Sequence, residues 1–500
     1  MCFSMAEIMP WKTFVRLSDI TTSNNPCVLC FTVMVSWPRQ EKMDWKRLIE
    51  RLRRIIMTND KLSAEELRNP DSVPPMSQAI PLGLQHVLAM FVSNFTPAII
   101  IGLAAGFSFG SPDLVYLIQM CMLFAGIATL FQTVGFGPVG ARLPIMQGTS
   151  FAFIPVMIPV VKTAGLGALF GGIVVGGLFH AFLGTVVARM RNLLPPLVTG
   201  LVVVSIGLAL LPTGIKYAAG GVPLMGKPEF GGLDHWFLAL VVIVVSLGLK
   251  FFARGMLSTA AILLGLIAGY VIAIPMGMVN FGNVAKASWF ALPNPMNFGF
   301  EFNAAAIIGI MLISIVSAIE TVGDISGVTK GGAGREATDK ELSGGTFADG
   351  LGTALAGFFG ALPNTSFSQN VGLIALTGVM SRIVVTLGAV FLIICGLVPK
   401  IGALISSMPI AVLGGGVVVM FGMVVAAGIN MLSDVVWTRR NMVILAVALS
   451  VGLGLQAVPE ALQHLPSTMK VLLSSGLLPV AFVSIVLNAV LPEVDDKSVL

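Results

Sequence analysis

Long hydrophobic stretches recur along this 500-residue chain, from near Pro81 to Leu491. Many reach the roughly 17 to 25 residues that a helix needs to cross a bilayer. Because the bilayer interior offers the backbone no hydrogen bonds, such stretches must form helices or line cavities enclosed by protein. Hydrophobic residues make up 56% of the chain and charged residues 11%, which is more apolar surface than a soluble protein can bury. The sequence therefore predicts an all-α polytopic membrane protein.

We expect fourteen transmembrane segments. Three are weak, because 145–161 contains polar residues and prolines while 345–361 and 365–380 are short and rich in glycine. Weak segments of this kind are typical of broken helices that line a cavity. The expected segments are 80–105, 113–134, 145–161, 166–188, 194–211, 235–253, 256–279, 303–326, 345–361, 365–380, 382–399, 402–429, 440–456 and 468–491.

Basic residues are distributed unevenly among the connections between these segments. If the N-terminus is cytoplasmic, the cytoplasmic connections hold eleven Lys and Arg residues and the opposite connections hold six lysines. All eight arginines after residue 76 then fall on the cytoplasmic side. Since cytoplasmic loops carry the excess of Lys and Arg, we expect a protein of the inner or plasma membrane with both termini in the cytoplasm. The +5 net charge predicts no nucleic-acid partner, because the basic residues lie mostly at membrane boundaries.

Residues 1–79 differ from the rest and are expected to form a cytoplasmic tail. Residues 39–54, "RQEKMDWKRLIERLRR", are basic and amphipathic, as in a helix that lies on an anionic membrane surface. The alternative is that synthesis starts at Met43 or Met57, so that the upstream residues are disordered or not expressed. Cys27 and Cys30 have CxxC spacing, but no second pair accompanies them, so neither a disulfide framework nor a metal site is predicted.

Two short runs indicate an internal repeat. "GTSFAF" at 148–153 and "NTSFSQ" at 364–369 share the tripeptide TSF, 216 residues apart, in the third and tenth segments. Seven segments separate them, and an odd number per repeat turns the second half over in the membrane. We expect two inverted repeats, 80–280 and 303–492, followed by a cytoplasmic tail, 493–500. Short extended stretches in segments 3 and 10 would meet at the substrate site, as in secondary transporters.

Ionisable residues inside the predicted segments are candidate functional residues, because each costs about 2.5 to 3.5 kcal/mol to insert. Glu320 and Asp324 are four residues apart in "SAIETVGDISG", so both carboxylates face one side of the eighth segment. Two carboxylates in a site of low dielectric favour binding a proton between them. For Asp324 the alternative is a charge at the cytoplasmic membrane surface, paired with Lys330.

Two further positions carry similar alternatives. Asp349, in "TFADGLGTALAG", begins the ninth segment and is either functional or a helix cap. His86 follows Gln85 in "LGLQHVLAMF" on the first segment, and it either serves the site or bonds to a neighbouring helix.

The run "SFSQNVGLIALTG", 366–378, is too polar to start as a helix. We expect it to stay extended to Asn370 and to become helical from Val371, with the amides of Gln369 and Asn370 at the positive helix end. A carboxylate and an amide suit a planar heterocycle with alternating N–H and C=O groups: Glu320 accepts from a ring N–H, and Gln369 offers a donor and an acceptor. Phe151 or Phe367 would stack on the ring, unless these side chains only pack against protein or lipid.

These residues resemble the nucleobase-ascorbate transporter family, also called the nucleobase-cation symporter 2 family. "QNVGLIALTGV" fits the family signature, "QHVLAMF" looks like its first-segment Gln-His motif, and "ETVGD" resembles its eighth-segment motif. The likeness covers about residues 80–492. The resemblance implies a core domain and a gate domain, a homodimer, an elevator-like movement and symport of a nucleobase with a proton.

The resemblance also implies residue roles. Glu320 and Gln369 would hold the base and Asn370 would set affinity, while Asp324, Asp349, His86 and Gln85 would support the site or proton coupling. Gln at position 369 is similar to the xanthine and urate branch, whereas uracil-type members usually have Glu there. Ser150 stands where some xanthine members have Asn, so xanthine and urate both stay open.

Other functions receive less support from the sequence. Another nucleobase such as uracil is one alternative, and anion transport by a protein of the same fold is a second. An intramembrane enzyme would need a nucleophile-base pair, a metal motif or a phosphate loop, and "KGGAGREATDK" lacks the terminal Gly-Lys-Ser/Thr of a P-loop. We therefore expect a transporter without enzymatic activity, cofactor or metal.

Overall fold

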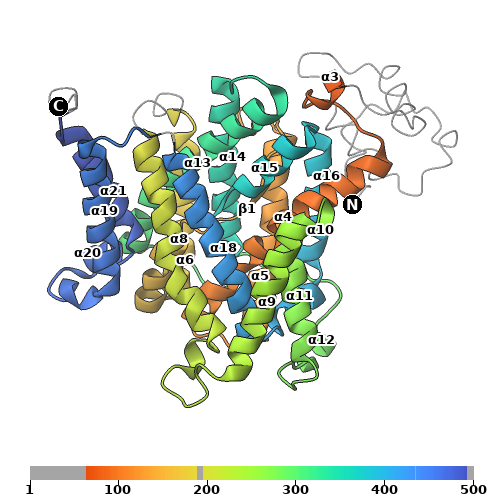
Figure 1. Cartoon of the computed structure of the whole chain (residues 1–500), viewed down its shortest axis with the longest axis vertical. Helices are drawn as coiled ribbons and strands as arrows, with labels where there is room; N and C mark the ends of the chain where they lie inside the picture. Colours follow the sequence, from red (N-terminus) through yellow and green to blue (C-terminus); the bar gives the residue numbers. More distant parts are fainter. Residues whose placement is uncertain (1–63, 188–194, 434, 493–500) are drawn as a thin grey trace.

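The computed structural model describes residues 64–187, 195–433 and 435–492 (Figure 1). The predicted tail segment 39–54, the Cys27/Cys30 pair and the tail 493–500 lie outside these residues. The described elements are α3 (Ala64–Leu67), α4 (Met76–Ala104), α5 (Pro112–Thr133), β1 (Gln147–Thr149), α6 (Ile154–Leu183), α8 (Pro196–Ala218), η3 (Val222–Leu224), α9 (Leu233–Phe252), α10 (Met256–Thr259), α11 (Ala261–Ala273), α12 (Gly282–Lys286), α13 (Ala304–Val328), η4 (Thr329–Ala333), α14 (Asp339–Phe358), β2 (Asn364–Ser366), α15 (Ser368–Thr377), α16 (Arg382–Leu397), α17 (Pro399–Ser406), α18 (Ile410–Leu432), α19 (Arg439–Ala457), η5 (Pro459–Leu462), α20 (Ser467–Leu473) and α21 (Leu477–Val490).

Eight of the described helices are long and apolar enough to cross a membrane. A ninth span results if α16 and α17, which meet at a bend of 78°, are counted together. Two shorter apolar helices, α11 and α21, add to this set. The chain is therefore a multi-pass membrane protein, with fewer uninterrupted spans than the fourteen segments read from hydropathy.

Several predicted segment boundaries are corrected by the structure. The break predicted between segments 145–161 and 166–188 is present at Gly165, where non-helical backbone with φ of 82° divides α6 into two helical parts, while the first part begins only at Ile154. A positive φ is accessible to glycine without steric cost, so the chain changes direction here with little loss of helix. The predicted segment 256–279 divides into α10 and α11, and the segment 468–491 divides into α20 and α21.

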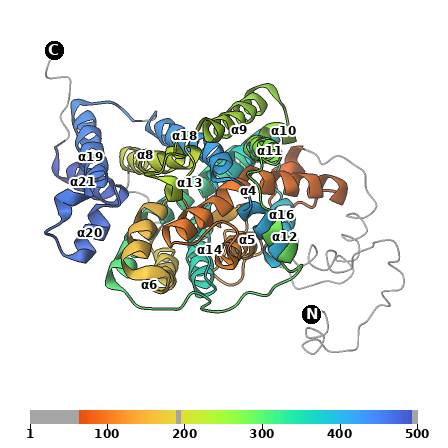
Figure 2. The same ribbon diagram turned by 90° about the horizontal axis from the view of Figure 1, so that it is seen from below.

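The helices form two groups (Figure 2). In the first bundle, α4, α5, α6, α13, α14 and α16 pack mainly against one another. In the second bundle, α8, α9, α11 and α18 pack together, and α19 and α21 lie beside α8. Helices of the first bundle approach closely where side chains are small: a Cβ on Gly126 of α5 would lie 2.7 Å from the carbonyl oxygen of Ala389 on α16.

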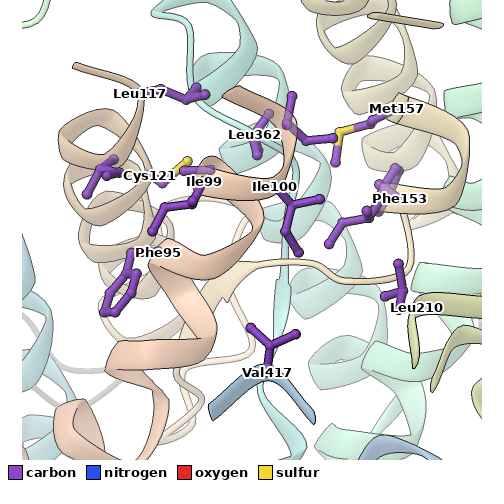
Figure 3. Close-up of a cluster of buried hydrophobic side chains, with 14 of the residues drawn as sticks. Phe95, Ile99, Ile100, Leu117, Cys121, Phe153, Met157, Leu210, Leu362 and Val417 are labelled. Carbon is purple, nitrogen blue, oxygen red and sulfur yellow. The ribbon is translucent and has the colours of Figure 1, made fainter. Parts of the chain in front are cut away.

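A buried apolar cluster joins the two bundles (Figure 3). Its members include Phe95 of α4 and Cys121 of α5, together with Leu210 of α8 and Val417 of α18. All four side chains are at most 1% exposed. Apolar contact of this kind carries no directional hydrogen bonds.

The only strands in the described part of the chain are β1 and β2, which pair in antiparallel fashion. Gln147 pairs with Ser366, Gly148 with Thr365 and Thr149 with Asn364. All six residues are buried among helices. The sequence prediction of extended backbone at both TSF runs is therefore confirmed, and the pairing satisfies backbone groups that a broken helix leaves open.

Candidate functional site

The paired strands bring the two polar runs of the sequence together. Buried Asn94 of α4 fixes the first strand, because its Oδ1 accepts from the backbone N–H of Thr149 at 2.9 Å and from the Thr149 hydroxyl at 3.2 Å. On the second strand, the hydroxyl of Ser317 on α13 donates to the Thr365 hydroxyl at 3.2 Å. Helices α4 and α13 thus hold the pair of strands from two sides.

Asp349 lies at the centre of a buried hydrogen-bond network. Gln132 of α5 donates its side-chain N–H to Asp349 Oδ1 at 2.6 Å, and Gln147 of β1 donates to the same oxygen. The Thr321 hydroxyl of α13 donates to Oδ2. Asp349 is 0% exposed and lies inside α14, whose N-cap is Thr338. The helix-cap alternative for Asp349 is therefore wrong, since the residue lies well inside the helix.

Asp324 binds the second strand rather than a surface cation. Its Oδ2 accepts from the Ser366 hydroxyl at 2.6 Å, and the residue is 7% exposed. Lys330 instead pairs with Glu336 at 3.0 Å in the connection after α13. The alternative of a Lys330-paired surface charge is therefore wrong, because the helical spacing turns Asp324 inward toward β2.

Glu320 differs from the other two carboxylates. It lies one turn before Asp324 on α13 and is partly exposed. Among the described residues its side chain has no hydrogen-bond partner, although its charge interacts with those of Asp324 and Asp349. Its carboxylate oxygens are consequently free to accept hydrogen bonds from a ligand.

The polar run after β2 becomes helical earlier than its composition predicts. Helix α15 begins at Ser368 with Phe367 as N-cap, so Gln369 and Asn370 lie in the first turn and not in extended backbone. The prediction that helix starts at Val371 was too late, because the pairing of β2 ends at Ser366 and frees the following residues. The expected place of both amides at the positive end of the helix is nevertheless confirmed.

The two amides of α15 have different surroundings. Asn370 is buried, and its Nδ2 donates to His86 Nδ1 at 3.0 Å and to the His86 carbonyl oxygen at 2.8 Å. Of the two alternatives for His86, the bond to a neighbouring helix is therefore confirmed. Gln369 is partly exposed and has no side-chain partner in the described part of the chain. Next to His86, Gln85 donates to the Thr259 hydroxyl of α10 at 3.0 Å, which links the first bundle to the second.

The two candidate stacking residues also differ. Phe367 is 5% exposed and packs in an apolar cluster with Val87 and Met90 of α4. Phe151 is partly exposed, and its ring meets that of Phe421 on α18 edge-on, with centroids 5.5 Å apart. Ser150 is buried beside it, and its hydroxyl accepts from the backbone N–H of Ala152 at 3.3 Å. The Phe151 side chain is thus more exposed than that of Phe367.

Comparison with known proteins identifies the family of this chain. Residues 77–461 match the Xan_ur_permease family model, which is described as "Permease family". The chain belongs to this family, the nucleobase-ascorbate transporters.

Named relatives of this permease cover most of its length. It is 36% identical to the uric acid permease PucJ of Bacillus subtilis over 420 residues, which are 83% of this chain and 93% of the relative. It is also 36% identical to the xanthine permease of Bacillus subtilis over 418 residues, again 83% of this chain and 93% of the relative. The uric acid transporter UacT of Escherichia coli is 36% identical over 424 residues, 84% of this chain and 87% of the relative.

Solved structures share the fold of the permease at low sequence identity. The transmembrane domain of the cyanobacterial bicarbonate transporter BicA aligns with a TM-score of 0.52 at 16% identity, over 82% of this chain and 97% of that one. The murine anion transporter Slc26a9 aligns with a TM-score of 0.53 at 12% identity, over 84% and 70%. The permease therefore has the fold of these membrane transporters.

Several residues of the permease site escaped the sequence analysis. Gln132, Gln147 and Thr321 surround Asp349, Ser366 binds Asp324 and Asn94 holds β1. A polar side chain in an otherwise apolar span is a detectable signal, and Gln132 in "LFQTVG" is an example. Hydroxyl and amide groups are too frequent in such spans, however, for composition to identify their partners.

Proposed function

We propose that this permease imports a purine nucleobase, xanthine or urate, together with a proton. The proposal rests on one difference among the polar side chains: some have hydrogen-bond partners within the protein and others do not. Asp324, Asp349 and Asn370 are buried and hydrogen-bonded to protein, whereas Glu320 and Gln369 are partly exposed and have no side-chain partners in the described residues. Polar groups left unpaired inside a membrane protein are costly, so a ligand that completes their hydrogen bonds is favoured.

A purine base has the required groups. The Glu320 carboxylate accepts from a ring N–H, and the Gln369 amide supplies one donor and one acceptor to neighbouring N–H and C=O groups. Phe151 supplies an aromatic face for the ring. Ser150 acts beside the site rather than on the ring, because its hydroxyl already bonds to the backbone. The Nδ2 of Asn370 is likewise engaged by His86, whereas its buried Oδ1 has no partner among the described residues. Phe367 packs beneath β1 and supports the shape of the site.

Proton coupling is supported by the grouping of Glu320, Asp324 and Asp349. Glu320 and Asp324 lie one turn apart on α13, and Thr321 of the same helix bonds to Asp349, so a proton bound among these carboxylates relieves their mutual repulsion. One positive charge that moves inward through about 100 mV yields roughly 2.3 kcal/mol. At about 1.36 kcal/mol per decade, that energy sustains a little under two decades of concentration gradient. A movement of α15 or α4 would be transmitted to the second bundle through His86 and Gln85.

The strand register supports the fourteen-segment inverted repeat. Thr149 pairs with Asn364, and Gly148 pairs with Thr365. A shift of 216 residues turns one pair into the other, as expected for two repeats related by a two-fold axis between the strands. In this proposal the first bundle is the core domain and the second is the gate, the protein is a homodimer in the inner or plasma membrane, and both termini are cytoplasmic.

Anion transport is the second candidate, because the fold is shared with a bicarbonate transporter. The identity to that structure is 16%, against 36% to named xanthine and uric acid permeases. We therefore favour the purine base.

One uptake assay tests the proposal. Cells that express the permease are given radiolabelled xanthine or urate, with unlabelled xanthine, urate, uracil or hypoxanthine as competitors, with and without an uncoupler. We expect competition by xanthine or urate and loss of accumulation with the uncoupler. Competition by uracil alone would favour the other nucleobase branch, and bicarbonate uptake without purine uptake would favour the anion transporter.

A further inference from the structure

The residues just before α4 lie along the junction between α15 and α16. The backbone N–H of Met380 donates to the Leu67 carbonyl oxygen at 2.8 Å, and that of Arg382 donates to the Pro70 carbonyl oxygen at 3.0 Å. The Ser381 hydroxyl donates to the Ser72 carbonyl oxygen at 2.7 Å. We call residues 67–72 the strap, since they satisfy the polar backbone of a junction about 310 residues later in the chain.

The side chain of Arg382 connects the strap to a second helix. Its Nε lies 2.7 Å from Asp71 Oδ1 in the strap, and its Nη1 donates to the Thr133 carbonyl oxygen, at the end of α5, at 2.9 Å. The Arg382 side chain is only 4% exposed, while that of Asp71 is 29% exposed. A charge-assisted bond to a buried guanidinium is strong, and its loss is costly, so Asp71 contributes to holding this junction in place.

The helices on both sides of this contact carry residues of the candidate site. Helix α15, which ends just before the junction, carries Gln369 and Asn370 in its first turn. On α5, Gln132 immediately precedes Thr133 and donates to Asp349. The Thr386 hydroxyl of α16 adds a further bond to the Thr133 hydroxyl, at 2.8 Å. A displacement of Arg382 would therefore move the helix that carries the amides relative to the helix that holds the buried carboxylate.

We propose that the strap, through the Asp71–Arg382 pair, positions α15 and the end of α5 for transport. Asp71 and Arg382 are positioning residues that contact no substrate. This inference rests on the proposed function, because its main readout is purine uptake. The inference assigns a role to the strap, which lies directly before the first span. This role does not extend to residues 1–56.

The test compares Asp71→Asn, which removes the charge, with Asp71→Glu, which keeps it. Glu336→Gln is the matched control, because it removes an acid from the exposed ion pair with Lys330. At equal membrane abundance, we expect Asp71→Asn to raise the KM for uptake about tenfold or more, because it removes the charge of a carboxylate that bonds to the buried guanidinium. Asp71→Glu should restore most of the affinity, and Glu336→Gln should behave as wild type.

Truncations separate the strap from the rest of the tail. Deletion of residues 1–56 leaves the strap intact and should leave KM unchanged, whereas deletion of residues 1–72 should raise it as Asp71→Asn does. An Asp71→Asn protein with wild-type KM would overturn the proposal. A lower melting temperature with unchanged KM would also overturn it, since that is the result of a merely structural contact.

Hydrogen exchange tests the same inference without a substrate. In the purified full-length protein, backbone amides of α15 should exchange faster in Asp71→Asn than in wild type or Glu336→Gln. Unchanged exchange in α15 would contradict the positioning role. If wild type moves neither xanthine nor urate, the proposed function fails, and the exchange result still decides whether the strap holds α15.

Discussion

Asn370 holds His86 by two hydrogen bonds, from its Nδ2 to the ring Nδ1 at 3.0 Å and to the backbone carbonyl oxygen at 2.8 Å. The two residues are 284 positions apart and come from α15 and α4. Since Nδ1 accepts from the amide, the neutral ring carries its proton on Nε2. The pair therefore fixes both the tautomer of His86 and the orientation of α15, which carries Gln369 in its first turn.

We expect Asn370→Ala to weaken purine uptake mainly through KM. The substitution leaves His86 Nδ1 without a donor inside the protein, a cost of about 1–3 kcal/mol. His86→Asn retains an acceptor near the Nδ1 position and should be milder than His86→Leu. Uptake kinetics at matched membrane abundance measure the difference, and equal kinetics for His86→Asn and His86→Leu would argue against a role for this bond.

Glu320→Gln should abolish uptake of radiolabelled xanthine or urate. The variant loses the carboxylate that accepts a ring N–H, and a hydrogen bond to a charged group is worth about 1.5–3 kcal/mol, or roughly ten- to a hundredfold in affinity. It also loses a proton-binding group. Glu336→Gln, in an exposed ion pair, serves as control. Normal transport by Glu320→Gln at unchanged membrane abundance would refute the assigned role.

Gln369→Glu should change the preference among bases. The substitution replaces an amide that both donates and accepts by a carboxylate that only accepts, so a base that presents N–H groups to this position gains relative to one that presents C=O. A competition profile across xanthine, urate, hypoxanthine and uracil gives the readout. If the profile is unaltered, Gln369 does not contact the base.

Thr321→Val should impair transport without unfolding the protein. Valine keeps the shape of threonine but removes the hydroxyl that donates to Asp349, which retains Gln132 and Gln147 as donors. The lost bond to a charged group corresponds to about 1.5–3 kcal/mol. Thr163→Val, at an exposed position of α6, is the matched control. Equal uptake by the two variants would show that the network around Asp349 is not needed for transport.

Glu341 makes the stability of the α13–α14 connection dependent on pH. Burial alone would raise the pKa of Glu341, but hydrogen bonds from Arg335 and Thr338 outweigh it and hold the pKa below the ordinary value of 4.5. A lowered pKa in the folded state contributes stability above the ordinary pKa, and that contribution is lost as pH falls through the folded value. The Arg335 bonds, at 2.6 and 2.8 Å, and the capping box with Thr338 should together stabilise by about 1–2 kcal/mol.

The melting temperature of the purified protein checks this effect. At pH 7, Glu341→Gln should melt below wild type, and the gap should start to narrow near the ordinary pKa of 4.5 and close as the pH falls through the lower pKa of the folded state. A gap that stays constant as the pH falls through this range would contradict the charge-dependent role of this pair.

The sequence by itself determined the membrane environment, the family and the residue types of the candidate site. Hydropathy is a local property, so long apolar runs such as α4 and α18 are evident without any tertiary information. The i, i+4 spacing of Glu320 and Asp324 follows from helix geometry alone. The shared TSF runs likewise pointed to extended backbone, which the pairing of β1 with β2 confirms.

Only the tertiary structure decided which polar groups find partners. From the sequence alone, Asp349 is either a helix cap or a site residue. In the structure, three donors from α5, β1 and α13 place it in a buried network. Phe151 and Phe367 are equivalent candidates in the sequence, yet one is partly exposed and the other packs on α4. These outcomes depend on contacts between segments more than 200 residues apart. Helical and strand periodicity fix the face on which a side chain lies, but the partner on that face is set by how the segments pack.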